Sequence, residues 1–240
     1  MAKSTRAKKW LKRLFVWLPL GFCLISIGQV LLLRWVDPPA SSFMAIRQVS
    51  GWLDDGIDYR IDYRWRDLTA VSAQLPIAVV ASEDQRFPHH HGFDFESMQK
   101  AFQSNRNGRK VRGGSTISQQ LAKNLFLWSG RSYVRKALEA WYTVWIEMLW
   151  PKRRILEVYV NVVEFGDGVY GAEAASRRFF GKPAKSLNRT QAARLAAVLP
   201  NPKRYSAADP GPYVQRRTRA IERQIRRLGG PGYLDACCAR

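Results

Sequence analysis

An uncharged run from Leu14 to Leu33 constrains this chain more than any other stretch of its sequence. At a rise of about 1.5 Å per helical residue, the run is long enough to cross a hydrocarbon core roughly 30 Å thick. A cleaved signal would have a shorter apolar region with a small-x-small site directly after it, whereas Arg34 and Trp35 follow here. The sequence therefore predicts one uncleaved transmembrane anchor over residues 14–36.

Basic residues precede this run and set its predicted orientation: Lys3, Arg6, Lys8, Lys9, Lys12 and Arg13. Because basic flanks stay cytoplasmic, residues 1–13 are predicted to be a cytoplasmic tail, and the chain after Asp37 to lie outside. The net charge of +20 favours an anionic partner, and this topology argues against nucleic acid and leaves anionic lipid or a phosphorylated substrate. The cysteines predict no disulfide framework, since Cys23 lies in the apolar run and Cys237 and Cys238 are adjacent.

Helical patterns dominate the rest of the chain and predict an all-α fold. Residues 37–42 read as a linker, residues 43–66 as a helix followed by a strand-like stretch over 59–65, and the chain from Leu68 onward as helical. Residues 103–114, rich in Asn, Gly, Arg and Lys, are predicted to be mobile. Capping residues and apolar spacing predict helices around 77–81 and over 95–102, 117–127, 132–150, 152–163, 192–199 and 213–228.

Two acids, Glu83 and Asp84, stand where the apolar run 77–81 ends, ahead of a turn rich in His, Pro and Gly. A carboxylate at the edge of an apolar wall is suited to act as a base near neutral pH. The alternative is an acidic pair that caps and solvates a helix end. On this stretch alone the alternative is the stronger interpretation, and the rest of the chain decides between the two.

The helix predicted over 117–127 has a polar side and an apolar side. Gln120, Lys123 and Asn124 share the polar side, which fits either a solvated surface or a lined groove. On the next predicted helix, Arg135 and Glu139 have the spacing of an i,i+4 ion pair.

Five separated blocks lie between Leu75 and Tyr205. They are Glu83-Asp84-Gln85-Arg86-Phe87 through Asp94, Gly113-Gly114-Ser115-Thr116-Ile117-Ser118-Gln119-Gln120 through Asn124, Arg135-Lys136-x-x-Glu139 through Glu147, Arg154-Ile155-Leu156-Glu157-x-Tyr159-x-Asn161, and Ala192 through Pro202. In this order and spacing the blocks resemble the peptidoglycan glycosyltransferases, the polymerase module of class A penicillin-binding proteins, and most closely their monofunctional membrane-anchored members. Ser118 stands where threonine is common in that family, and Val160 where leucine is usual.

The resemblance implies a lysozyme-like large lobe with a smaller membrane-facing jaw lobe over residues 67–240, after a membrane-proximal segment over 37–66. It implies a single-pass protein of the inner (cytoplasmic) membrane with a periplasmic catalytic domain. The implied reaction polymerises lipid II, an undecaprenyl-pyrophosphate-linked disaccharide-peptide, onto a lipid-linked glycan chain. It forms β-1,4 linkages with inversion and releases undecaprenyl pyrophosphate. Membrane lipid and proteins of cell-wall synthesis or division are the further partners that it implies.

By the same resemblance, Glu83 and Glu139 are the catalytic carboxylates. The chemistry agrees for Glu83, because an alcohol needs a base to become a good nucleophile, and a departing pyrophosphate needs cations more than a proton. The predicted substrate-binding residues are Ser115, Gln119, Gln120, Lys123, Asn124, Arg131, Arg135 and Lys136. The predicted supporting residues are Asp84, Phe87, His91, Glu157 and Asn161.

The role of Glu139 stays open between orienting Arg135 or Lys136, holding a divalent cation such as Mg²⁺ or Mn²⁺, and assisting the leaving group. No cofactor is expected as a firm requirement. His91 is expected to support the loop of Glu83, while His89 and His90 are expected at the surface.

Two other functions compete with polymerisation. A lysozyme-like hydrolase or lytic transglycosylase also uses a glutamate in a helical lobe. It acts on finished, uncharged glycan, however, and does not need the cations from Lys123 to Lys136. An anchored basic scaffold that holds partner proteins or anionic lipid explains neither the paired acids nor the face of Gln120, Lys123 and Asn124. The sequence therefore favours the polymerase.

Overall fold

The computed structural model describes residues 2–55, 60–99 and 114–238, with side chains described from Val16 onward and not for residues 54–55. The segment predicted to be mobile, 103–114, lies outside the described residues except for Gly114. Residues 1–37 and 38–240 form two separate compact units. The first holds a single helix, α1 (Ala2–Leu32), with Pro19 inside it and exposed apolar side chains that include Trp17, Leu24 and Ile25. In the described part of the chain, no helix is both long enough and apolar enough to cross a membrane.

The second unit is mostly helical, as predicted. Its helices are α2 (Ser42–Asp55), α3 (Gln74–Glu83), α5 (Ile117–Phe126), α6 (Tyr133–Leu149), α7 (Lys152–Val162), α8 (Ala172–Phe180), α9 (Arg189–Val198), α10 (Pro212–Arg227) and α11 (Asp235–Cys238). Short 3-10 turns cover Leu68–Ala70, Phe87–His89, Ala184–Ser186 and Gly230–Leu234, and residues 95–99 form a further helical segment. Side chains cap these helices at their N-termini: capping boxes open α5 and α9, and Asp94 Oδ1 accepts the N–H of Ser97 at 3.0 Å.

A three-stranded sheet departs from the predicted all-α class. Its strands are β1 (Asp62–Tyr63), β2 (Glu164–Gly166) and β3 (Val169–Tyr170), in the order β1-β3-β2. β1 pairs with β3 in parallel, and β2 pairs with β3 antiparallel. Two-residue strands are too short to show alternation, and the pairing of β1 joins segments far apart in the chain. The sequence therefore indicated only the strand-like stretch that contains β1.

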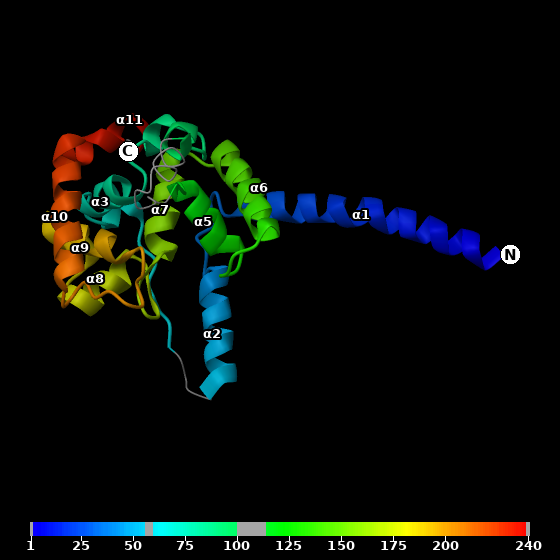
Figure 1. The fold of residues 1–240 in the computed structure, drawn as a ribbon, viewed down its shortest axis with the longest axis horizontal. Coiled ribbons are helices and arrows are strands. Elements are labelled where there is room, and N and C mark those ends of the chain that lie inside the picture. The colour runs from blue at the N-terminus through cyan, green and yellow to red at the C-terminus, as the bar shows by residue number, and fades with distance from the viewer. Residues whose placement is uncertain (1, 56–59, 100–113, 239–240) are drawn as a thin grey trace. The chain divides into compact units, whose positions relative to one another are not determined.

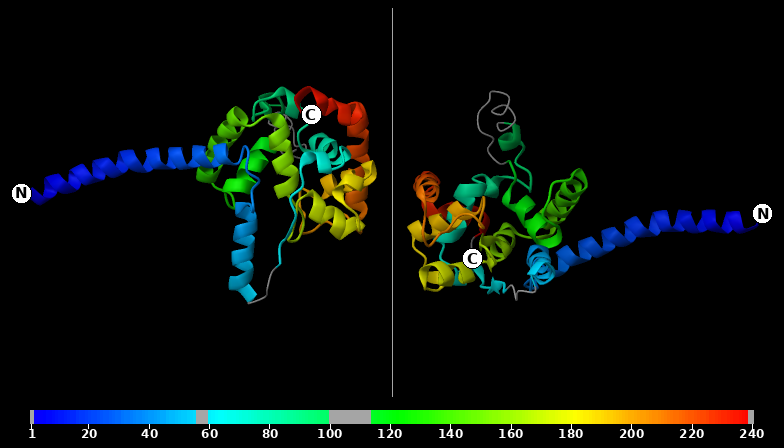
Figure 2. Two further views of the ribbon diagram at one scale, coloured as in Figure 1. Left: turned by 180° about the vertical axis from the view of Figure 1, so that it is seen from behind. Right: turned by 60° about the horizontal axis from the view of Figure 1, so that its bottom comes forward.

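The packing of the second unit places the ends of α3 and α5 at its centre. In Figure 1, α3, α9 and α10 lie together on one side and α5 and α6 on the other, with α7 between them, and Figure 2 keeps this order in two further views. α9 packs against both α3 and α10, and α5 packs against α6 and α7. Residues 75–81 of α3 are fully buried, so this helix holds its last residue, Glu83, in place from the core.

Gly171 makes the turn from the sheet into α8. Its φ of +84° is a conformation that residues with a side chain rarely adopt, and a Cβ at this position would lie 2.4 Å from the backbone oxygen of Asn161. The sharp entry of α8 against α7 therefore requires glycine.

Candidate active site

Glu83 ends α3 with its carboxylate only partly exposed to solvent. Its Oε1 accepts hydrogen bonds from Ser82 Oγ at 2.9 Å and from Arg217 Nη2 at 3.2 Å. Its Oε2 accepts one from Gln120 Nε2 at 3.1 Å. Three elements, α3, α5 and α10, thus meet at this carboxylate.

Gln120 is held from its other end by Tyr159 of α7, whose hydroxyl donates to Gln120 Oε1 at 2.8 Å. Tyr159 is fully buried, and burial, together with the nearby Glu83 and Asp84 carboxylates, raises the pKa of its hydroxyl well above the ordinary value. The hydroxyl therefore stays protonated near neutral pH and remains a donor. Gln120 was predicted to bind substrate, and in the structure both ends of its amide are engaged within the protein.

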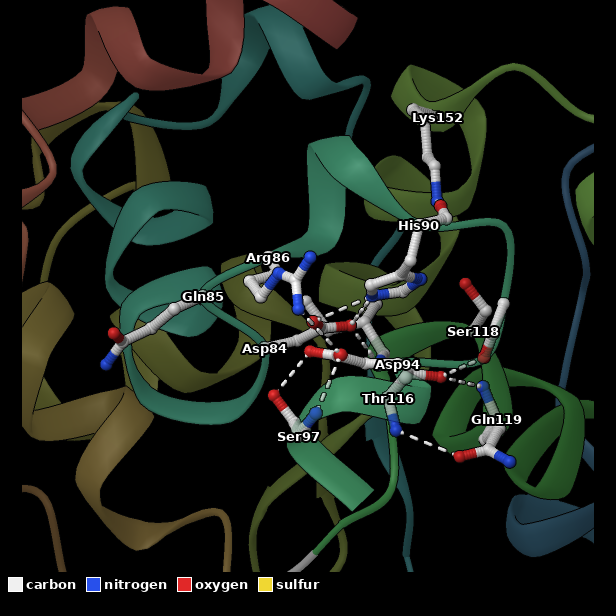
Figure 3. A network of polar contacts seen from close by, with 12 residues as sticks. Asp84, Gln85, Arg86, His90, Asp94, Ser97, Thr116, Ser118, Gln119 and Lys152 are labelled. Carbon is white, nitrogen blue, oxygen red and sulfur yellow. Dashed lines mark hydrogen bonds and ion pairs between the residues drawn. The ribbon is translucent and has the colours of Figure 1, made fainter. Parts of the chain in front are cut away.

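Asp84 joins the end of α3 to the start of α5 (Figure 3). Its Oδ2 accepts the backbone N–H of Ile117 at 2.9 Å, and its Oδ1 lies 2.9 Å from His90 Nε2. The carboxylate is buried, so these bonds are sheltered from water and fix the first turn of α5 beside Glu83. Asp84 therefore links α3 to α5 beside Glu83.

The support expected from His91 comes instead from His90. The His91 side chain is exposed, whereas His90 is buried against Asp84. The 3-10 turn over Phe87–His89 sets which histidine points inward, and this register was not readable from three consecutive histidines. Phe87, in the same turn, is fully buried, and Lys152 Nζ lies 4.5 Å from the centroid of the Phe87 ring.

Gln119, which was predicted to bind substrate, closes the capping box at the start of α5. Its Oε1 accepts the N–H of Thr116 at 3.1 Å, while its own N–H donates to Thr116 Oγ1 at 3.2 Å. Thr116 Oγ1 in turn donates to the carbonyl of Gly92 at 2.6 Å. Gln119 is buried in this capping box, because the box turns its side chain back toward the helix start. It holds α5 rather than lining a groove.

Glu139 lies buried on α6 between two cations, and its ion pair with Arg135 is the i,i+4 pair that the spacing predicted. Its Oε2 accepts from Arg135 Nη1 at 2.9 Å, and its Oε1 pairs with the ammonium of Lys136. The hydroxyl of Thr143 donates to the Glu139 carbonyl at 2.7 Å. Arg135 is almost as sheltered as Glu139, whereas Lys136 is half-exposed.

Lys123 lies within electrostatic reach of both carboxylates. Burial lowers the pKa of its ammonium below the ordinary 10.5, Arg135 and Lys136 lower it further, and Glu139 and Glu83 oppose the shift. Its Nζ lies 5.7 Å from the ring centroid of Phe43 on α2. Within the described ranges no carboxylate forms an ion pair with this ammonium, so its charge is available to an anionic ligand.

The remaining predicted residues divide into surface and core positions. Ser115 and Arg131 are exposed, and Asn124 is buried on α5. Glu157 accepts the N–H of Leu68 at 2.8 Å and the Nη1–H of Arg154 at 2.9 Å. Asn161 exchanges two hydrogen bonds with the backbone of Arg66, at 3.0 and 2.8 Å. Glu157 and Asn161 thus fasten the chain after β1 to α7, which fits a supporting role.

The contacts of three further residues near the site could not be predicted from the sequence. Arg217 was one of several arginines on the last long helix and carried no distinguishing signal. Tyr159 was noted only as part of a block. Ser118, fully buried, donates to Glu147, which also accepts from Lys152 Nζ at 2.9 Å. Among the residues whose structure is described, no group of three or more His, Cys, Asp and Glu could hold a metal ion.

This chain matches a known protein family in sequence. The model of the family described as Transglycosylase matches residues 55–226. A biosynthetic peptidoglycan transglycosylase of Xanthomonas campestris pv. campestris (strain B100) is 56% identical over 237 residues, covering 98% of this chain and 96% of that protein. Proteins of the same name from Xanthomonas oryzae pv. oryzae and Xylella fastidiosa (strain M23) are 59% and 54% identical, covering 91% and 94% of this chain and 89% and 93% of their own lengths.

Proposed function

Because this chain belongs to the transglycosylase family and polymerises the glycan of peptidoglycan, we propose that its substrate is lipid II. The growing lipid-linked glycan chain is the donor in this proposal, and the 4-hydroxyl of the acceptor's terminal sugar attacks its anomeric carbon. The carbon inverts, a β-1,4 linkage forms, and undecaprenyl pyrophosphate leaves. The biosynthetic names of the relatives favour this reaction over the hydrolase and scaffold alternatives.

The observation that carries the proposal is the carboxylate of Glu83, held at the junction of α3, α5 and α10 with Lys123 within electrostatic reach. As the new C–O bond forms, the acceptor hydroxyl loses its proton, and Glu83 is the base that takes it. The electron pair of the breaking bond leaves with the pyrophosphate, whose charge Lys123 stabilises.

Glu139 supports the cations in this proposal rather than reacting itself. Both of its oxygens are occupied, by Arg135 and by Lys136, so it fixes where their charges point. A divalent ion is not proposed as a requirement. If Mg²⁺ or Mn²⁺ raises the rate, it is expected to arrive on the pyrophosphate, since such ions favour phosphate oxygens. Titration with a chelator should then lower activity only in proportion to substrate-bound metal.

The membrane arrangement is also part of the proposal. The uncharged residues of α1 expose large apolar side chains, which supports an anchor in the inner membrane with the catalytic unit outside. On α2, Ile46, Val49, Trp52 and Leu53 are exposed with helical spacing, while another side of the helix packs on α5. This apolar side of α2 is proposed to contact lipid next to the substrate's prenyl chain.

The test replaces Glu83 by glutamine and follows polymer formation from labelled lipid II. Glu83→Gln keeps the size of the side chain and removes its basicity, so the rate should fall by about 10²–10⁴-fold. Circular dichroism should match the wild type. Incubation with purified sacculi checks the hydrolase alternative, which predicts shortened strands. A Glu83→Gln variant that folds normally and polymerises at a near-normal rate would exclude Glu83 as the base.

A further inference from the structure

The two oxygens of the Glu83 carboxylate have different surroundings. Oε1 accepts two hydrogen bonds, from Ser82 Oγ and Arg217 Nη2, whereas Oε2 accepts only one, from Gln120 Nε2. A carboxylate oxygen offers about two acceptor sites. Within the described part of the chain, Oε1 is therefore filled, and Oε2 keeps one acceptor site for a ligand.

The side-chain amide of Gln120, which donates to Oε2, is fixed in one orientation. Tyr159 donates to Gln120 Oε1 at 2.8 Å, so the amide nitrogen of Gln120 is the end that must face Glu83. Rotating the amide would place its carbonyl oxygen against the carboxylate and its NH₂ group against the tyrosine hydroxyl. Because Tyr159 is fully buried, its hydroxyl has no water to bond instead.

One of the two donors to Oε1 comes from a helix that lies outside the five blocks. Arg217 belongs to α10, which packs against α9 and α3, and its guanidinium reaches both Ser82 Oγ, at 3.0 Å, and Glu83. Less than a third of the Arg217 side chain is exposed, and its Nε is buried without a hydrogen-bond partner in the described residues. The side chain is therefore committed to this corner rather than extended into solvent.

We propose that Arg217 and the Tyr159–Gln120 pair are positioning residues that select Oε2 of Glu83 as the proton acceptor. This inference rests on the proposed function, because it names the atom that works in that reaction. The acceptor O–H bond breaks as its oxygen bonds to the anomeric carbon, and the proton moves to Oε2. The electron pair of the glycosyl–pyrophosphate bond leaves with the pyrophosphate, while Arg217 keeps Oε1 occupied throughout.

The first test compares Arg217→Gln and Arg217→Lys in the full-length protein, with Arg216→Gln as the matched control. Arg216 is the exposed neighbour on the same helix and carries the same charge. With lipid II as substrate, Arg217→Gln should lower kcat by about 10–100-fold, the loss expected when a reacting group is misplaced by about 1 Å. KM should change little, and Arg216→Gln should behave as the wild type.

The split between kcat and KM, measured per folded enzyme, separates positioning from simple structural support. Loss of Arg217 should lower kcat and leave KM near the wild-type value, because the carboxylate is misplaced while the contacts to substrate remain. Arg217→Lys should restore part of kcat, because an ammonium can still donate to Oε1. A purely structural residue would instead lower the amount of active protein and leave kcat per folded enzyme unchanged.

The second test is Tyr159→Phe, which removes only the hydroxyl that fixes Gln120. It should lower kcat by several-fold and leave KM unchanged, since the hydroxyl contacts Gln120 and not the substrate. If Arg217→Gln folds poorly, Tyr159→Phe and Arg217→Lys still test the proposal. Combining Arg217→Gln with Glu83→Gln should add no further loss of rate, because the two residues act through one carboxylate.

Several results would overturn the proposal. A raised KM with unchanged kcat in Arg217→Gln would show that Arg217 contacts the substrate. A raised kcat would show that the Arg217–Glu83 ion pair slows the base instead of positioning it. Equal rates in Arg217→Gln and Arg216→Gln would remove any positioning role. Each of these outcomes leaves Glu83→Gln inactive and the proposed function standing. An active Glu83→Gln would instead remove the proposed function and this inference together.

Discussion

At the scale of single residues, the proposed reaction uses Lys123 as the cation that meets the pyrophosphate, because Lys123 is within electrostatic reach of Glu83 and Glu139. Charge-assisted hydrogen bonds from its ammonium should strengthen as negative charge develops on the leaving group. We therefore expect Lys123→Ala to lower kcat/KM by about 10²–10³-fold, with part of the loss in kcat, as for one oxyanion donor. Steady-state polymerisation of labelled lipid II measures both constants.

The control for that substitution is Arg223→Ala, which removes an exposed charge from α10. It should leave the rate nearly unchanged. Equal losses in Lys123→Ala and Arg223→Ala would show that bulk positive charge matters, and the pyrophosphate would have to bind elsewhere.

The lowered pKa of Lys123 gives a second expectation at this scale. The ammonium loses its proton as the pH rises through a value below the ordinary 10.5, so wild-type activity should decline on the alkaline side of its profile. An arginine stays protonated up to a pH of about 12 or higher. Lys123→Arg should therefore start from a lower rate, since a planar fork replaces a compact ammonium, yet keep that rate further into alkaline pH. Identical alkaline declines in the two proteins would contradict the assignment.

Individual residues also show which parts of the candidate site could be predicted from the sequence. Glu83 and Glu139 stood in recognisable blocks, and the structure gives both of them charged partners. The exchange of His91 for His90 turns on a one-residue register in a 3-10 turn, which no periodicity fixes. Arg217 could not be singled out, because its contact depends on how α10 packs onto α3, and that is a property of the assembled unit.

At the scale of elements, the start of α8 depends on Gly171. Replacing it by alanine forces a positive φ on a residue with a side chain and drives a Cβ into the carbonyl of Asn161. Gly171→Ala should therefore lower the free energy of unfolding by about 2–4 kcal/mol. Urea unfolding followed by circular dichroism measures the change.

Gly181, at the other end of α8, is the matched control. It also has a positive φ, of +65°, but no atom lies within 4 Å of a Cβ built there. Gly181→Ala should lower the free energy of unfolding by only about 1 kcal/mol, the cost of the backbone conformation alone. Similar losses in the two variants would mean that contact with Asn161 is not what makes Gly171 necessary.

The elements themselves were predictable where the signal was local. Both capping boxes and the starts of α5, α6 and α7 follow from neighbouring residues, so their predicted bounds agree with the structure to within a few residues. The sheet could not be predicted in the same way. β1 and β3 pair through two residues each, and what stabilises them is the fit of distant segments rather than their own pattern.

At the scale of the whole molecule, residues 38–240 hold their own core and form a unit apart from residues 1–37. Deleting residues 1–36 should leave a folded protein with an unchanged melting temperature. It should also lower kcat/KM on vesicle-bound lipid II by at least about tenfold, because the proposed anchor would raise the effective concentration of enzyme at the membrane. Thermal melting and assays on vesicles, compared with detergent-solubilised substrate, measure the two effects.

The comparison with detergent is the control, since the proposed anchor should affect the rate much less there. A truncated protein that fails to fold would show that the first unit contributes to the stability of the second. Equal rates on vesicles would show that the catalytic unit holds the membrane without help from the anchor.

The contact between Arg217 and Glu83 also has a consequence for the timing of synthesis. The two residues are 134 positions apart, so the arginine is made well after the glutamate. At about 5–20 residues per second, a ribosome needs on the order of ten seconds to travel from one to the other. During that interval the nascent chain carries its glutamate without the arginine, and α3 lacks the cover of the finished α10. The proposed base therefore gains its second partner at Oε1 only once α10 has been made.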